Sequence, residues 1–424
     1  MAGFPSDLGI KGKKVRVEGM GCTLSRADAD GLAGALREGG YDVVGDEEEA
    51  DAVIINGCTV REASDFKLRE KIRKLRALGK EVIVTGCTAE ANPYVATAAG
   101  AHLLPLSRRG DFFKVLAVPE PEIPSLLPPP PGGPIYVMPI GTGCGGSCTY
   151  CITKLARGRI ASYPSRAVLS TVKRAIEGGA VEVDLTAVEI NSWGKDTGES
   201  FPDLLRSLSA LKGDFMIRVG MINPRSLLDW LDDLLDAFSG EKVFKFFHVP
   251  VQSFSDRVLK AMKRGYTASE AFEVITTIRR RYPEASIHTD IIVGFPGESE
   301  ADFDETVDAL KRLSFDKVNV ARFSPRPLTE AASMEDQVSE GEKKRRTEIV
   351  TELWRRHALE LNSQYLGKVV QCLIVEPRSP AALGRTANYK QVVLPGKLES
   401  GARVRALITR ATPIDLRGEV AKDL

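Results

Sequence analysis

The chain has 424 residues, of which 43% are hydrophobic and 27% charged, and its formal net charge is +1 at pH 7. This balance is typical of a globular protein with sizeable cores, and it excludes a disordered chain or a surface that attracts nucleic acid everywhere. No run approaches the roughly 18 uninterrupted apolar residues of a membrane span, and the start lacks the apolar centre of a secretory signal. We therefore expect a cytoplasmic protein of about three domains with no membrane partner.

The first part of the chain, residues 1–118, alternates strand-like and helix-like stretches. Three apolar runs each end at the same tripeptide, Gly-Cys-Thr; they are 14–20, 51–56 and 80–85. Two stretches with apolar residues at helical spacing lie between them, 28–38 and 66–78. The rhythm predicts a βαβ domain with a parallel sheet.

The cysteines of the three tripeptides are Cys22, Cys58 and Cys87. Because the carboxyl ends of parallel strands meet at one edge of a sheet, we expect these side chains to lie close together. Without an export signal, such cysteines favour metal ligation or buried thiols over disulfides. They could therefore share one metal site, or be three buried thiols that happen to follow strands.

Residues 119–134 are dense in proline and glycine, which can neither continue a helix nor fill a central strand, so they predict a linker. Six apolar strand candidates then alternate with helical patterns; the candidates are 135–141, 181–188, 215–221, 244–251, 287–295 and 315–323. Over residues 135–361, this alternation predicts a (β/α)6 partial barrel or a large doubly wound sheet. Either fold places its working site at the carboxyl ends of the strands.

The last part of the chain, residues 362–424, has short alternating runs between Gly and Pro turns, which predicts a small antiparallel β-barrel. It contains ten Lys or Arg and five Asp or Glu, a net charge of +5. The charge favours RNA binding through a basic rim, with Tyr365 and Tyr389 available for stacking, over a barrel without a ligand. We also expect that this segment can be deleted without loss of the metal sites, because all six candidate ligands precede it.

Cys144, Cys148 and Cys151 follow the strand candidate 135–141, so three thiolates project from one loop at the carboxyl end of a strand. A closed structural zinc site needs four ligands, and no nearby Cys or His supplies a fourth. A four-iron cluster with three protein ligands keeps one iron open, which can bind the amino and carboxylate groups of S-adenosylmethionine. The CxxxCxxC spacing with an aromatic before the last cysteine is typical of that radical chemistry.

Five other residues have more than one interpretation. Tyr150 could pack on the adenine of the cofactor or belong to the core, and Glu189 could bind the methionine amino group or the base, or cap a turn. Arg218 lies inside an apolar strand and needs a carboxylate partner, for which the methionine carboxylate is a candidate. Arg157 and Arg159 could meet phosphate or be ordinary surface residues.

The chain resembles the radical S-adenosylmethionine methylthiotransferase family over nearly its whole length. The features that carry the resemblance are the three-cysteine first domain, the CxxxCxxC loop, residues 247–253 and 289–298, and a terminal barrel like a TRAM domain, in the family's order. Residues 155–158, 162–164 and 218–224 resemble the archaeal and eukaryotic branch that acts on threonylcarbamoyladenosine in tRNA. The alternatives are another methylthiotransferase substrate, isopentenyladenosine in tRNA or a ribosomal protein, and an RNA-binding protein with structural metal.

The resemblance implies two [4Fe–4S] clusters. One, held by Cys144, Cys148 and Cys151, would cleave S-adenosylmethionine to a radical that removes hydrogen from a C–H bond. The other, held by Cys22, Cys58 and Cys87, would present sulfur, and a second S-adenosylmethionine would supply the methyl group. The product would carry a methylthio group on C2 of the modified adenosine at position 37. The partners would be a tRNA anticodon loop, an electron donor and a sulfur source.

Three features depart from the family pattern. Gly57 stands where the family usually has Thr, which predicts a looser loop around the second ligand. Val188, Glu189 and Ile190 replace the branch's usual core of that segment, which affects contacts to base or cofactor. Leu328 stands where the family commonly has Gly, so we expect that turn to differ.

Overall fold

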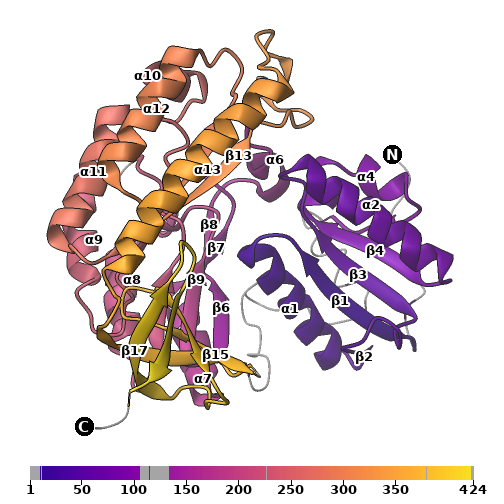
Figure 1. Cartoon of the computed structure of the whole chain (residues 1–424). Helices are drawn as coiled ribbons and strands as arrows, with labels where there is room; N and C mark the ends of the chain where they lie inside the picture. The colour runs from indigo at the N-terminus through magenta and orange to yellow at the C-terminus, as the bar shows by residue number, and fades with distance from the viewer. Residues whose placement is uncertain are drawn as a thin grey trace.

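The computed structural model describes residues 10, 12–105, 114, 133–225, 227–378 and 380–421. The linker predicted at 119–134 lies outside the described residues, apart from its last two. Three parts follow one another along the chain: a first α/β domain, a central partial barrel and a small terminal β-barrel beneath it (Figure 1). Within the described part of the chain, no helix has the length and apolar character needed to cross a bilayer.

The first domain is a five-stranded parallel sheet in the order β2-β1-β3-β4-β5. Its strands are β1 (Lys14–Met20), β2 (Asp42–Val43), β3 (Ala52–Gly57), β4 (Glu81–Gly86) and β5 (His102–Leu103). Its helices are α1 (Thr23–Glu38), α2 (Glu62–Ala77), α3 (Cys87–Ala91) and α4 (Tyr94–Thr97). All six residues of β3 are buried, because α1 covers one face of the sheet and α2 the other. The predicted parallel βαβ domain is confirmed, with two short strands added.

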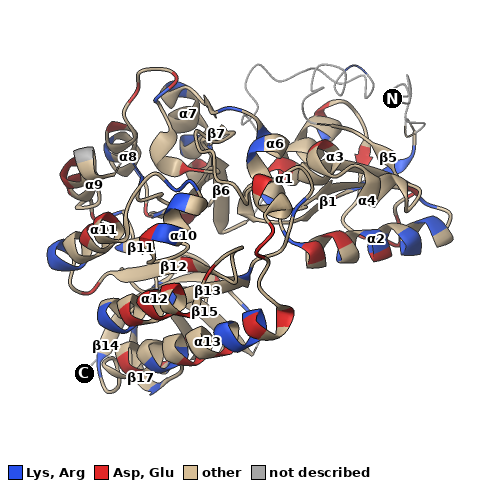
Figure 2. Ribbon diagram, turned by 90° about the horizontal axis from the view of Figure 1, so that it is seen from above, with Lys and Arg blue, Asp and Glu red and all other residues tan. Residues whose placement is uncertain are grey.

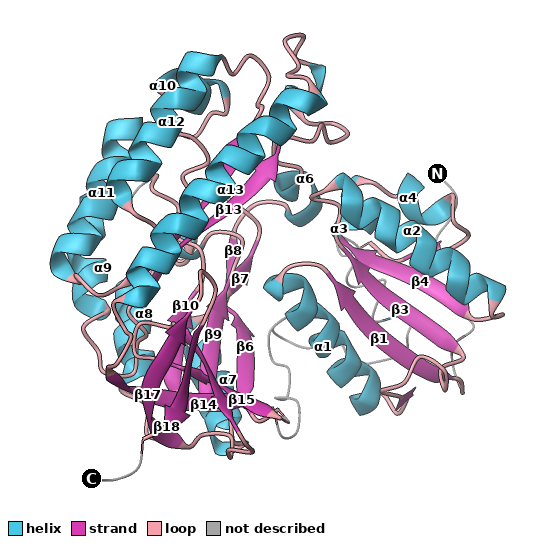
Figure 3. Cartoon of the chain, in the orientation of Figure 1, coloured by secondary structure: helices cyan, strands magenta, loops and turns pink. Residues whose placement is uncertain are grey.

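The central part has six parallel strands in two sheets, β10-β9-β6 and β11-β12-β13. Isolated parallel bridges between the β10 region and the β11 region connect the two sheets. The strands are β6 (Ile135–Pro139), β9 (Glu182–Thr186), β10 (Met216–Val219), β11 (Phe246–His248), β12 (Ser286–Val293) and β13 (Lys317–Arg322). Seven helices cover the outside (Figure 3): α7 (Ser165–Glu177), α8 (Phe201–Ser209), α9 (Leu231–Ala237), α10 (Asp256–Ala261), α11 (Ala268–Arg281), α12 (Glu300–Leu313) and α13 (Glu340–Ser363). The curved arrangement confirms the partial barrel rather than the doubly wound sheet.

The terminal part is a closed barrel in the order β14-β15-β16-β18-β17. Its strands are β14 (Val369–Glu376), β15 (Ala381–Arg385), β16 (Gln391–Pro395), β17 (Arg403–Ala411) and β18 (Leu416–Val420). The barrel is mixed and not purely antiparallel as predicted, because β16 and β18 pair in parallel. Five strands in a closed ring cannot alternate direction throughout, so at least one neighbouring pair must be parallel.

Charged residues of both signs are mixed on two surface helices. Acidic and basic residues are interspersed along α2 and α13 (Figure 2), and some pair within one helix, as Glu342 does with Arg345 and Arg346. Both helices have more Lys and Arg than Asp and Glu, six against three in α2 and six against five in α13, so neither helix is acidic.

Candidate iron–sulfur sites

The loop with Cys144, Cys148 and Cys151 lies between β7 (Gly141–Thr142) and α6 (Thr153–Arg157), with β8 (Ala161–Ser162) pairing back on β7. The Gly146 N–H donates to the Sγ of Cys144 at 3.2 Å. A Cβ added at Gly146 would lie 3.2 Å from that sulfur and 3.8 Å from the Sγ of Cys148. Two of the three sulfurs therefore border one space, which glycine leaves open.

Burial raises the pKa of two thiols of this loop and makes them poor acids on their own. Burial and the charge of Glu189 raise the pKa of Cys144 to about 11, and burial raises the pKa of Cys151. A thiolate is the form that ligates metal, so a bound cation must supply the stabilisation that the protein does not. The donor set fits a metal cluster better than reactive free thiols.

Glu189 lies beside this loop. Its side chain is 3% exposed and follows β9, and the Cys144 thiol approaches its Oε2 at 3.7 Å. The Nη2 of Arg225 donates to Oε1 at 3.4 Å. The structure thus places a buried carboxylate next to the first cysteine, and its role as a cofactor ligand stays a prediction.

Arg264 is a site residue that the sequence analysis missed. It is 5% exposed, and its Nη1 donates to the Sγ of Cys148 at 3.3 Å and to the Tyr150 hydroxyl at 3.2 Å. Its Nη2 donates to the carbonyl of Pro250 at 2.8 Å. The Tyr150 ring stands edge-on to Phe295, with centroids 6.5 Å apart. Tyr150 therefore packs on the chain's own residues, and a contact with adenine stays a prediction.

Arg218 has a carboxylate partner within the chain. Its Nη1 lies 3.6 Å from Asp184 Oδ2, and its guanidinium lies over the rings of Phe246 and Tyr389, at 5.0 and 5.3 Å. These contacts lie at the floor of the partial barrel, which is the end that packs on the terminal barrel, and not at the cysteine loop. A role for Arg218 in binding methionine stays a prediction.

The second set of cysteines gathers at the carboxyl edge of the first sheet. Cys22 precedes α1, Cys58 follows β3 and Cys87 begins α3. A Cβ added at Gly21 would meet the Cβ of Cys58 at 2.9 Å. Burial raises the pKa of Cys58, and the charges of Cys87 and Cys22 raise it further. The structure brings the three thiols together as the parallel sheet predicts, while metal binding by them stays a prediction.

Gly57 fits tightly where the family has Thr. It is buried in β3 and paired with Met20 and Gly86 on the neighbouring strands. A Cβ there would lie 2.8 Å from the Oγ1 of Thr88 and 3.0 Å from the Cδ2 of Leu68. Thr88 fills the space that a side chain would need, and β1 and β4 pair with the strand before Cys58 on both sides, while a looser loop after it stays a prediction.

The chemistry of the donor atoms decides which metal group each set suits. Within the described ranges, no three His, Cys, Asp or Glu side chains are close enough to hold one ion. Thiolates around zinc lie about 3.8 Å apart, because each Zn–S bond is about 2.3 Å. A four-iron cluster is larger and holds its thiolates farther apart. Each set offers three thiols, the donor set that holds a [4Fe–4S] cluster with one iron open, so the residues present fit that group.

Arg157 corrects the sequence analysis, because it meets neither phosphate nor bulk solvent. Its side chain is 4% exposed and its Nη1 lies 2.5 Å from Asp28 Oδ2. Its Nε donates to the Sγ of Cys87 at 3.3 Å. Arg159, two residues further, is exposed.

A second buried ion pair, between Arg326 and Asp65, joins the turn after β13 to α2.

Tyr389 also corrects the sequence analysis. It points into the partial barrel, where its hydroxyl donates to Glu182 Oε1 at 2.9 Å and its ring lies 4.8 Å from that of Phe246. It is therefore not available to stack on RNA. Tyr365 is half-buried, and its hydroxyl accepts from Asn388 at 2.8 Å.

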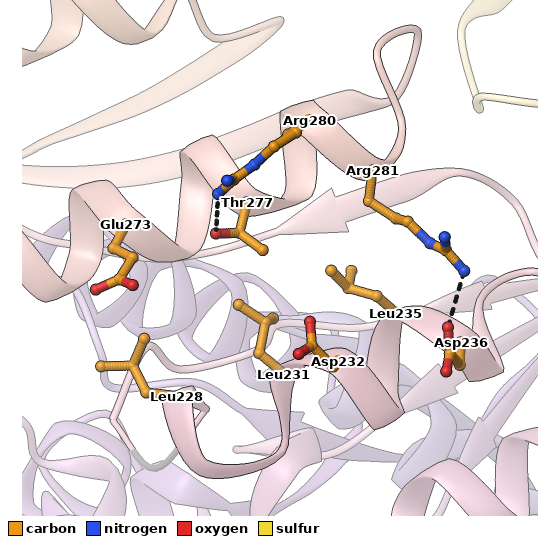
Figure 4. Close-up of a pocket in the computed structure, with 9 residues that line it drawn as sticks. All are labelled: Leu228, Leu231, Asp232, Leu235, Asp236, Glu273, Thr277, Arg280 and Arg281. Atoms are coloured by element: carbon orange, nitrogen blue, oxygen red, sulfur yellow. Dashed lines mark hydrogen bonds and ion pairs between the residues drawn. The ribbon is translucent and has the colours of Figure 1, made fainter.

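A groove of about 640 Å3 lies on the outside of the partial barrel, between α9 and α11 (Figure 4). Three leucines line it, Leu228, Leu231 and Leu235. Arg281 bridges its end by donating to Asp236 at 2.8 Å. None of the predicted site residues is among its lining side chains, so it is separate from both cysteine sets.

Comparisons with known proteins agree with this geometry. Residues 138–310 match the model of the radical SAM superfamily, and residues 14–102 match that of the uncharacterized protein family UPF0004. Among solved structures, the radical S-adenosylmethionine methyltransferase TsrM from Kitasatospora setae is similar, with a TM-score of 0.58 and 15% identity over 75% of this chain and 74% of that one. Fold and site thus define a radical SAM protein, a class that uses S-adenosylmethionine and a [4Fe–4S] cluster.

Two curated relatives narrow the class. The probable threonylcarbamoyladenosine tRNA methylthiotransferase of Pyrococcus horikoshii is 38% identical over 96% of this chain and 99% of the relative. The threonylcarbamoyladenosine tRNA methylthiotransferase of Drosophila melanogaster is 33% identical over 97% of this chain and 78% of the relative. The chain belongs to the threonylcarbamoyladenosine tRNA methylthiotransferase family.

Proposed function

We propose that this enzyme adds a methylthio group to C2 of N6-threonylcarbamoyladenosine at position 37 of tRNA, in the cytoplasm. The observation that carries the proposal is that the chain has two three-cysteine sets, one in each of two domains, and that Arg157 connects the two domains beside them. The family's full-length relatives supply the substrate class. An electron donor and a sulfur source are its further partners.

Cys144, Cys148 and Cys151 would hold one [4Fe–4S] cluster, and Cys22, Cys58 and Cys87 a second. When bound, the first cluster would supply the electron for reductive cleavage of S-adenosylmethionine, and the resulting radical would remove hydrogen from C2 of the base. The chain's own residues orient the reactants. Arg264 fixes Cys148 and Tyr150 in one geometry, and Glu189 presents a buried carboxylate on which a protonated amino group of methionine can dock.

Capture of tRNA falls to the exposed face of the terminal barrel. Lys368, Arg405 and Arg410 are exposed there, and among the described residues none of them has an acidic partner within ion-pair distance. Val369 and Leu407 pair across β14 and β17 and are 46% and 37% exposed. A basic face with exposed apolar residues suits a phosphate backbone and unstacked bases.

Nucleoside mass spectrometry of tRNA tests the proposal. Cells with the gene should contain the methylthiolated nucleoside, and cells without it only the threonylcarbamoyl form. Methylthiolated isopentenyladenosine instead would assign the other tRNA substrate. An unchanged nucleoside profile, with no cleavage of S-adenosylmethionine under reduction, would favour the RNA-binding protein with structural metal.

Iron analysis separates the two clusters. The reconstituted protein should hold about eight irons, and the triple Ala variant at Cys144, Cys148 and Cys151 about four, with no 5′-deoxyadenosine formed. The triple Ala variant at Cys22, Cys58 and Cys87 should still form 5′-deoxyadenosine but leave tRNA unmodified. Retention of cleavage by the first variant contradicts the assignment of the radical site.

A further inference from the structure

One short helix connects the two cysteine sets. Helix α6 begins at Thr153, two residues after Cys151, and ends at Arg157. It packs on α3, which begins at Cys87, through a small cluster of buried residues: Cys87, Ala91, Ile152 and Ala156. The segment that leaves the first cluster's loop therefore touches the element that begins with a ligand of the second.

Arg157 makes this contact polar and specific. Its Nε donates to the Sγ of Cys87 at 3.3 Å. Its Nη1 pairs with Asp28, on the helix that begins directly after Cys22. One buried guanidinium thus contacts Cys87 itself and the helix that begins directly after Cys22. Its Nη2 is buried with no hydrogen-bond partner among the described residues, so a further donor remains available.

We propose that Arg157 is a positioning residue that ties the two cysteine sets together and sets the reduction potential of the cluster at Cys22, Cys58 and Cys87. The inference rests on the two-cluster function proposed above. A positive charge and an N–H donor at a ligand sulfur stabilise the more negative, reduced cluster and so raise its potential. The Asp28 pair fixes the guanidinium plane, which a lysine ammonium cannot reproduce at both partners.

The test measures the second cluster alone. In the triple Ala background at Cys144, Cys148 and Cys151, only the second cluster contributes to an EPR-monitored redox titration. Arg157→Gln should move the midpoint to a more negative potential, and Arg157→Lys should lie between that variant and the parent. Arg159→Gln is the matched control, because Arg159 is exposed in the same segment, and its midpoint should equal that of the parent.

A readout without the metal accompanies the titration. In the apo protein, Arg157→Gln should increase deuterium exchange in α3 and α6, while Arg159→Gln should not. In the protein with both clusters, Arg157→Gln should slow tRNA methylthiolation by about tenfold, with formation of 5′-deoxyadenosine retained.

The outcomes separate the two proposals. If the parent background holds no cluster, the two-cluster function fails and this inference fails with it. If the cluster forms and Arg157→Gln has the midpoint and exchange of Arg159→Gln, only the role of Arg157 is overturned. If Arg157→Gln does not fold, Arg157→Lys decides, because a midpoint and exchange equal to the parent's overturn the role as well.

Discussion

The cysteine loop of the radical site depends on one buried arginine. Arg264 donates to a ligand sulfur, to a tyrosine hydroxyl and to a backbone carbonyl at once, and a lysine ammonium cannot span these three directions. We predict that Arg264→Lys lowers formation of 5′-deoxyadenosine by about ten- to a hundredfold, the usual effect of losing a residue that orients a metal ligand. Rates under reduction, measured per bound cluster, check this.

The neighbouring Lys263 is the control for this prediction. Its ammonium pairs with Glu330 on the surface, where both side chains are about half exposed. Lys263→Ala should keep the wild-type rate, since an exposed ion pair contributes little. Equal rates for Arg264→Lys and Lys263→Ala would show that Arg264 only fills space.

Leu328 is strained by its backbone. It has φ of 64° and is 82% exposed. Its left-handed backbone conformation therefore costs free energy that side-chain packing does not offset. We predict that Leu328→Gly stabilises the protein by about 1 kcal/mol, the cost of that conformation less the added freedom of glycine in the unfolded chain. Denaturant unfolding measures it.

Leu328→Ala separates strain from exposure. Alanine removes the apolar surface but retains the Cβ that makes the conformation costly, so its stability should stay close to that of the wild type. A gain for Ala as large as that for Gly would mean that the exposed side chain, and not the backbone, is unfavourable.

The sequence was sufficient to predict the site residues that belong to short, recognisable motifs. The loop of Cys144 is recognisable because three ligands lie within eight residues, and Cys22, Cys58 and Cys87 because the same tripeptide follows three strands. Arg264 was not recognisable as a site residue, and Arg157 was considered only as a phosphate contact or a surface residue. Each lies in a short polar stretch that looks exposed, and each is buried only because a distant segment covers it.

At the scale of one helix, Asp302 joins the start of α12 to α10. Its carboxylate accepts from Ser299 in a capping box, from Ser255 at 2.6 Å and from Arg257. Burial alone would raise the pKa of Asp302, but the hydrogen bonds from Arg257, Ser255 and Ser299 outweigh it and hold the pKa well below the usual range. The ionised form therefore stabilises the fold.

We predict that Asp302→Asn lowers the free energy of unfolding by about 1 to 3 kcal/mol at pH 7, because buried donors lose a charged acceptor. A carboxyl with a depressed pKa contributes stability above its unfolded pKa, about 3.9, and loses that contribution as pH falls through its folded pKa. The difference between wild type and variant should therefore shrink below about pH 4. Urea titrations at pH 7 and pH 3 would contradict this by giving equal differences.

Strands were predictable from the sequence where the hydrophobic pattern extended over enough residues. Each of the six central strands overlaps one of the six apolar runs, because the strand faces that helices cover need apolar residues. β2 and β5 have two residues each, too few to show a period. The parallel pair in the terminal barrel was not predictable from alternation either, because closure with five strands is a property of the ring.

At the scale of the molecule, the terminal barrel is part of the central fold. Met216, Phe244 and Phe246 share a buried cluster with Leu373 and Val375 of the barrel. Lys390 pairs with Asp316 at 2.6 Å, with side chains 10% and 7% exposed.

Deletion of residues 362–424, which the sequence suggested as harmless to the clusters, would expose this apolar floor and leave Asp316 without one of its cations. We predict that the deletion lowers the midpoint of thermal unfolding and increases binding of a hydrophobic dye. An unchanged midpoint for the deleted chain would show that the floor is stable alone. Deletion is therefore a poor test of RNA binding.

Substitution on the exposed face separates binding from folding. Lys368, Arg405 and Arg410 are exposed, so the triple Glu variant should keep the thermal midpoint and the formation of 5′-deoxyadenosine. Its affinity for tRNA should fall. The slope of log affinity against log salt should also become shallower by up to about three, because each lost phosphate contact releases about one counterion fewer.

The matched control is Lys344→Glu, near the start of α13, where the side chain is 70% exposed. It is about 30 Å from the barrel end of that helix, since a residue adds about 1.5 Å. The control should bind tRNA with nearly the wild-type salt slope. If the triple variant keeps that slope as well, the terminal barrel does not contact phosphate, and capture of tRNA must take place at the first domain and the mouth of the partial barrel.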